Sequence, residues 1–147
     1  MLNQEIEKLN TLIIRASKAY EKWYEKVNLP GYLIFILHEL LLKKKLSQRE
    51  LVALSSYPKQ SINKGIHLLK EQGYLYLVPL KKDSRVKSCR LTEEGEKYAE
   101  KLLEPLLDLE SKTAQIMGVK KMEQLTSLME EWRNIFLKLL KDESKED

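Results

Sequence analysis

Residues 46–92 constrain the fold most, because two short helical patterns and two strand-like patterns follow one another there without a linker. Ser47 lies three residues before Glu50, which is the spacing of a helix capping box and predicts the start of the first helix. Pro58 suits the first turn of the second helix, where its missing N–H costs nothing. Gly73 lies where a left-handed residue would end that helix. Apolar residues at helical spacing predict the buried faces: Leu51 and Leu54 in the first helix, and Ile62, Ile66 and Leu69 in the second. Two helices separated by so short a break predict a helix-turn-helix.

A hairpin is expected directly after the second helix. Residues 74–79 are rich in aromatic and branched side chains, and residues 86–91 alternate between apolar and polar. The basic loop between them contains Lys81, Lys82 and Arg85. A helix-turn-helix followed by such a hairpin predicts a winged helix-turn-helix, an arrangement that binds duplex DNA.

Positive charge is concentrated in the same stretch. The chain carries +4 overall, but residues 43–90 hold 12 Lys and Arg against three Asp and Glu, a local charge of +9. The remainder holds 14 basic and 19 acidic residues, a charge of −5. This distribution is typical of a nucleic-acid-binding face. The alternative is a solvated basic face, and the coincidence with the helix-turn-helix favours DNA contact.

The exposed face of the second helix carries side chains that pair with bases or phosphates: Lys59, Gln60, Asn63, Lys64, His67 and Lys70. In the hairpin, Lys81, Lys82 and Lys87 are expected to contact phosphate. An Arg on a thin loop can enter a narrow minor groove, so Arg85 is the expected minor-groove residue. Asp83 repels phosphate and is therefore expected to close the turn and to orient Arg85.

The remaining helices follow from apolar periodicity. Residues 2–27 carry an apolar stripe at spacings of three and four, which predicts a long amphipathic helix. Residues 32–42 are apolar on nearly all sides, which is typical of a helix at the centre of a domain. Thr92 can cap the helix that follows it, and Pro105 predicts a kink or irregularity within that helix. Residues 121–141 predict a final helix.

Together these patterns predict one domain over residues 1–147, mainly α with a small two- or three-stranded antiparallel β-wing and about six helices. Residues 46–92 are the expected DNA-binding lobe. Residues 2–27 and 93–141 are the expected dimerisation region, because they carry more apolar surface than a small winged module needs. Residues 142–147 are expected to form a disordered tail.

Several function classes find no support. The sequence has no apolar run of 18 residues and no signal-peptide pattern, so a cytoplasmic protein is expected. No catalytic motif is present, and neither His38 nor His67 lies in a metal-binding spacing. We therefore predict no enzyme activity, no catalytic residue, no metal and no cofactor. Cys89, the single cysteine, is expected to be a small buried side chain rather than a redox sensor.

Residues 46–95 resemble the MarR family of bacterial transcription regulators. The matching motifs are EQGYL at residues 71–75, Asp83-Ser84-Arg85 in the loop, and RLTEEG at Arg90–Gly95. The resemblance implies a homodimer that binds a pseudo-palindromic operator and that ligand, metal or oxidation can release. It also implies these DNA-binding residues: Pro58, Lys59, Gln60, Ser61, Asn63, Lys64, Lys81, Lys82, Asp83, Ser84, Arg85 and Lys87. Tyr76-Leu77, Leu80 and Pro58 depart from common family residues, which leaves the operator sequence open.

The resemblance also implies an effector site. Members of this family bind small aromatic or phenolic ligands near the junction of the first two helices and the C-terminal helices. The residues here that would line such a cleft are Tyr20, Trp23, Tyr24, Tyr32 and His38. The alternative, that these are ordinary core and interface side chains, is favoured because aromatic stripes usually pack.

The sequence thus favours a sequence-specific double-stranded DNA-binding transcription regulator, acting as a ligand-responsive homodimeric repressor. The alternative is a winged-helix module for protein–protein contact without a specific DNA target. Four cations close together in the wing region argue against that alternative.

Overall fold

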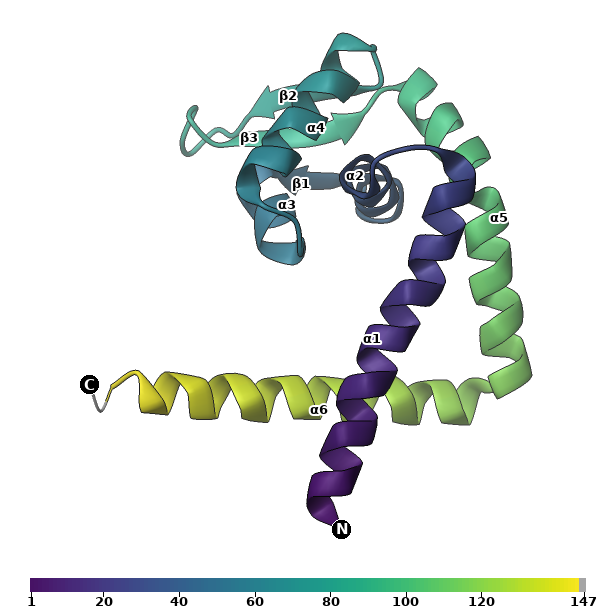
Figure 1. The fold of residues 1–147 in the computed structure, drawn as a ribbon. Coiled ribbons are helices and arrows are strands. Elements are labelled where there is room, and N and C mark those ends of the chain that lie inside the picture. The colour runs from purple at the N-terminus through teal and green to yellow at the C-terminus, as the bar shows by residue number, and fades with distance from the viewer. Residues whose placement is uncertain (146–147) are drawn as a thin grey trace. The chain divides into compact units, whose positions relative to one another are not determined.

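The computed structural model describes residues 1–145 and contains six helices and a small sheet (Figure 1). The elements are α1 (Leu2–Val27), α2 (Gly31–Lys43), β1 (Lys45–Ser47), α3 (Gln48–Leu54), α4 (Lys59–Glu71), β2 (Leu75–Pro79), β3 (Lys87–Leu91), α5 (Glu93–Met117) and α6 (Val119–Glu143). This confirms the predicted mainly α fold with an antiparallel β-wing.

The chain divides into two compact units. The first runs from Met1 to Glu104, and the second begins at Pro105. The boundary falls within α5, which remains helical through Pro105. All of the helix-turn-helix and the wing belong to the first unit.

The sheet has three antiparallel strands in the order β1-β3-β2. Cys89 at the centre of β3 pairs with Leu46 on β1 and with Leu77 on β2. The third strand arises because the residues just before the first helix of the helix-turn-helix are extended and lie along β3. Through this pairing, β1 fixes the start of α3 relative to the wing.

The core of the first unit is built around α2, as expected for an apolar central helix. Its buried residues are Leu33, Ile34, Ile36, Leu37, Leu40 and Leu41. The predicted inner face of α4 is confirmed, since Ile62, Ile66 and Leu69 are all buried. Gly65 lets the two helices approach closely, because a Cβ there would overlap the side chain of Ile36.

The structure contains the helix cap at Ser47 and the left-handed glycine at Gly73 that the sequence predicts. The Glu50 N–H donates to Ser47 Oγ at 3.0 Å, which confirms the cap of α3. Gly73 has φ of 80°, and the Tyr74 N–H donates to the Leu69 carbonyl at 2.9 Å. This is the left-handed C-terminus predicted for α4.

Three expectations need correction. Leu54 is 52% exposed rather than inward, because the short helix α3 buries only Leu51. Pro58 precedes α4 instead of lying in its first turn. Its ψ of 147° is outside the helical range, and its carbonyl accepts the Ile62 N–H. In the predicted tail 142–147, residues 142 and 143 continue α6, supported by a hydrogen bond from the Ser144 N–H to the Leu140 carbonyl. Residues 146 and 147 lie outside the described residues.

No helix within residues 1–145 has the combination of length and hydropathy that crossing a bilayer requires.

Candidate nucleic-acid interface

Helix α4 presents one polar face to solvent while its opposite face is held in the core. Lys59, Gln60, Asn63 and Lys64 are exposed, and Ser61 is half-buried. The packing of the buried face fixes the rotation of α4 about its axis, so the positions of the exposed polar side chains are fixed as well. Pro58, at the N-terminal end, is also exposed.

The wing loop is closed by short-range hydrogen bonds. The Leu80 N–H donates to the Val86 carbonyl at 2.9 Å, and the Val86 N–H donates to the Asp83 carbonyl at 3.0 Å. Asp83 Oδ1 accepts both the backbone N–H of Arg85, at 3.0 Å, and its side-chain Nε–H, at 3.2 Å. Asp83 therefore closes the turn and orients Arg85, as the sequence predicted. Lys81, Lys82, Ser84 and Lys87 are exposed around it.

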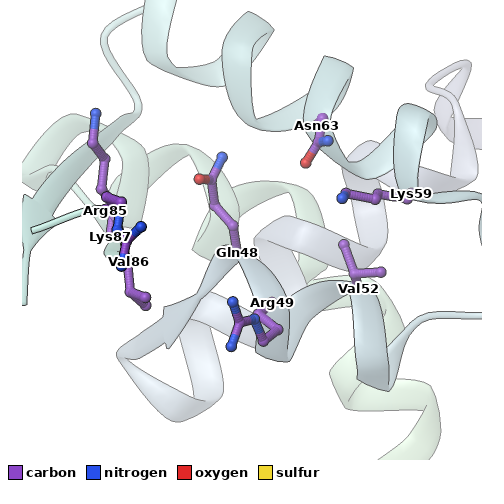
Figure 2. A pocket seen from close by; sticks show the side chains of 8 residues that line it. All are labelled: Gln48, Arg49, Val52, Lys59, Asn63, Arg85, Val86 and Lys87. Carbon is purple, nitrogen blue, oxygen red and sulfur yellow. The ribbon is translucent and has the colours of Figure 1, made fainter. Parts of the chain in front are cut away.

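A hollow of about 420 Å³ lies between α3, α4 and the wing (Figure 2). Eight residues line it: Gln48, Arg49 and Val52 from α3, Lys59 and Asn63 from α4, and Arg85, Val86 and Lys87 from the wing. In Figure 2, Gln48 extends into the space between the wing side chains and those of α4. Segments up to 39 residues apart in the sequence thus share one polar surface.

The hollow unites some of the predicted DNA-binding residues and leaves others outside. Lys59, Asn63, Arg85 and Lys87 line it. The other predicted residues lie beyond its walls: Pro58, Gln60, Ser61, Lys64, Lys81, Lys82, Asp83 and Ser84. Sequence reasoning missed the contribution of α3, although Arg49 belongs to the basic stretch and directly follows the capped start of that helix.

The hollow carries positive charge that nearby carboxylates do not neutralise. Among the ion pairs formed by residues 1–145, Arg85 pairs with Asp83, but Arg49, Lys59 and Lys87 have no carboxylate oxygen within 4 Å. Unpaired cations from three elements around one concavity attract an anion.

The structure has a hollow beside one of the five predicted effector residues. Tyr24 lines a separate hollow of about 630 Å³ together with Glu21, Glu25, Asn28, Leu29, Pro30, Gly31 and Tyr57. Tyr32 meets Tyr57 edge to face at 6.4 Å, and Trp23 meets Tyr24 at 5.9 Å. His38 Nδ1 lies 3.5 Å from Glu39. The lining residues of the hollow beside Tyr24 do not include Tyr20, Trp23, Tyr32 or His38.

Cys89 is fully buried between the strands, as predicted, and burial raises the pKa of its thiol to about 12. A thiol held neutral in this way is a poor nucleophile and a poor metal ligand. In the part of the chain that the structure describes, no three His, Cys, Asp or Glu side chains gather as a metal site would require.

The fold, the basic hollow and the exposed wing define a winged helix-turn-helix protein. Residues 34–86 match the sequence model of the MarR family, a segment that covers most of α2, the helix-turn-helix and the wing loop. Over this segment the chain is similar in sequence to the MarR family.

Solved structures with the same fold cover most of the chain. A MarR family regulator from Neisseria meningitidis is 23% identical, with a TM-score of 0.82 over 94% of this chain and 97% of that one. NadR in complex with 4-hydroxyphenylacetate is 22% identical, with a TM-score of 0.75 over 84% of this chain and 91% of that one. BpsR of Bordetella bronchiseptica, whose DNA binding is regulated by 6-hydroxynicotinic acid, is 16% identical, with a TM-score of 0.64 over 84% and 91%. No curated protein matches the sequence.

Proposed function

We propose that this protein is a transcription regulator that binds a specific double-stranded DNA operator. The observation that carries the proposal is the convergence of α3, α4 and the wing on one hollow with unneutralised cations. A winged module that served only protein contact would gain nothing from excess positive charge at this place.

In the proposed complex, α4 enters the major groove. Gln60 and Asn63 on its exposed face have amides that pair bidentately with adenine, whereas Lys59 and Lys64 reach phosphate or guanine. Arg85, held by Asp83, enters the adjacent minor groove. Lys81 and Lys82 contact the backbone and contribute affinity without sequence information.

The proposed functional form is a homodimer. Helix α6 has no buried residue in the single chain, and α1 has none either. The exposed apolar side chains of α6 include Leu128, Trp132, Ile135, Phe136 and Leu139. A second copy related by a twofold axis would cover these faces and set two α4 helices to meet successive major grooves, about 34–36 Å apart.

We further propose that the regulator is a repressor that a small aromatic compound releases from DNA. What supports this is the ligand chemistry of two proteins of the same fold, NadR with 4-hydroxyphenylacetate and BpsR with 6-hydroxynicotinic acid. Tyr24 and Tyr57, which line the second hollow, offer aromatic faces and hydroxyls to such a compound.

A mobility-shift assay tests the proposed function. The purified protein is titrated against a duplex from its own upstream region and against a random duplex of equal length, each at two salt concentrations. Tight binding to the upstream duplex with a large specificity ratio is expected. Weak binding that is equal for the two duplexes and falls steeply with salt would contradict sequence-specific regulation and favour the protein-contact alternative.

A further inference from the structure

We infer that the hollow between α3, α4 and the wing holds a backbone phosphate of the bound DNA, and that Arg49 is its principal positioning cation. The inference rests on the proposed function, because it concerns where the DNA strand runs on the same surface. It assigns a role to α3, which otherwise serves only to support α4.

The first argument is geometric. If α4 lies in a major groove and the wing lies in the adjacent minor groove, one sugar–phosphate strand must pass between them, because that strand separates the two grooves. The hollow occupies this position, with Lys59 and Asn63 on the side of α4 and Arg85 and Lys87 on the side of the wing. Its volume of about 420 Å³ leaves room for a phosphate and parts of the flanking sugars.

The second argument is chemical. Arg49, Lys59 and Lys87 come from three different elements and line the same space, and no carboxylate among residues 1–145 lies within 4 Å of any of them. Gln48 and Asn63 add neutral amide donors. An anion with several acceptor oxygens satisfies such a set of donors, and a planar guanidinium can bind a phosphate through two hydrogen bonds.

Arg49 and Arg85 differ in whether a carboxylate holds the side chain. The Arg85 side chain is turned back onto Asp83 by a hydrogen bond at 3.2 Å, whereas Arg49 has no such carboxylate partner in the described chain. A contact from Arg49 to phosphate would fix the depth and register of α4 in the groove without distinguishing one base pair from another.

The test compares Arg49→Ala with its neighbour Gln48→Ala. Both residues line the hollow, but only one carries charge. Binding of fluorescent upstream and random duplexes is measured by anisotropy at four or more salt concentrations. Arg49→Ala should weaken binding to both duplexes by roughly tenfold. It should also reduce the slope of log K against log salt by about 1. Gln48→Ala should leave that slope unchanged, and Arg49→Lys should preserve it.

Two results would overturn the inference. One is an Arg49→Ala protein that binds with wild-type affinity and salt slope. The other is a loss confined to the upstream duplex at an unchanged slope, which would make Arg49 a base-reading residue. In both cases the wild-type protein still binds DNA, so the proposed function would stand. If the wild-type protein binds no duplex at all, the proposed function fails and the phosphate site fails with it.

A scan with single neutral methylphosphonate linkages locates the phosphate directly. At one linkage in each half-site, the wild-type protein should lose roughly tenfold in affinity, whereas Arg49→Ala should lose clearly less at that linkage, because its principal contact there is already gone. Equal losses for the two proteins at every linkage would also overturn the inference.

Discussion

At the scale of single residues, Arg85 illustrates how an exposed pair can matter for binding and not for stability. Its side chain is 90% exposed, and the Asp83 carboxylate contacts both its backbone N–H and its Nε–H. An ion pair so open to solvent contributes little to folding. Its effect is to limit the directions in which the guanidinium points, which would lower the entropy that Arg85 loses in the proposed contact with DNA.

Arg85→Ala should weaken operator binding by about 1–3 kcal/mol while leaving the melting temperature unchanged. Asp83→Asn should cause a smaller loss, because the asparagine oxygen can still accept the two N–H groups. Anisotropy and thermal denaturation of the two variants measure both effects. An unchanged operator affinity in a folded Arg85→Ala protein would remove Arg85 from the mechanism.

Cys89, in contrast, is fully buried, so the protonation of its thiol is linked to folding. Its burial raises the pKa to about 12 from an ordinary value of 9.0. The folded state therefore keeps the thiol proton at a pH where the unfolded chain has released it. The resulting contribution is fully present below pH 9 and is lost as the pH rises from 9 toward 12.

Urea denaturation at pH 9 and pH 10 measures this contribution. Wild-type protein should lose about 1 kcal/mol of unfolding free energy over this interval in excess of the loss shown by Cys89→Ala. Working at or below pH 10 limits the contribution of Tyr57 and Tyr98, whose pKa values burial raises above 10.0. An identical pH dependence of the two proteins would show that the thiol titrates alike when folded and unfolded.

At the scale of elements, the Arg90–Gly95 motif joins the start of α5 to the end of α4. Thr92 Oγ1 accepts the Gly95 N–H at 3.0 Å and donates to the Gly73 carbonyl at 2.6 Å. The Thr92 N–H donates to the Tyr74 carbonyl at 3.0 Å, and the ring of Tyr74 stacks on that of Tyr98 at 4.4 Å. Two helix ends and the start of β2 are thereby held together by one threonine.

Gly95→Ala should destabilise this junction by about 1–3 kcal/mol, because the added Cβ would overlap the backbone carbonyl of Tyr74. The exposed neighbour Glu94 provides the control, since Glu94→Ala should change stability by no more than about 0.5 kcal/mol. Urea denaturation compares the two. Equal midpoints would show that α5 can shift away from β2 without cost.

At the scale of the whole molecule, the single chain leaves the apolar face of α6 uncovered. Trp132 and Phe136 are 41% and 57% exposed on this helix. Contiguous exposed apolar surface of this kind marks an interaction site in soluble proteins.

Trp132→Glu should dissociate the proposed homodimer, because it places a charge in the apolar face. Asn134→Glu is the control: it introduces the same charge on the polar side of the helix and should leave the dimer intact. Sedimentation velocity measures the assembly state, and the mobility-shift assay measures DNA binding of the same samples. A monomeric wild-type protein, or a dimeric Trp132→Glu protein, would contradict the role of this face.

The proposed effector acts on the whole molecule as well. Phenolic and aromatic acids at saturating concentration should raise the melting temperature, because a ligand that binds only the folded state stabilises it. The same compounds should weaken the mobility shift. If no compound in the panel moves the melting temperature, this class of effector is wrong for this protein.

The sequence by itself determined the helices, the two hairpin strands and most of their boundaries. The buried face of α4, the left-handed Gly73 and the cap at Ser47 could all be predicted, because each depends on residues within four or five positions of one another. The charge concentration and the Asp83–Arg85 turn were also visible, since both are contiguous in the chain. These local signals located the candidate DNA surface on α4 and the wing.

The tertiary structure alone decided how that surface is completed. Arg49 and Lys87 lie 38 positions apart, and they line one hollow because α3 follows directly from β1, which pairs with β3. Likewise, Leu51 and Leu54 are both apolar and lie at helical spacing, but only Leu51 is buried in the core. The physical reason is that periodicity specifies which side chains share a face of one element. Which element covers that face depends on the packing of all of them together.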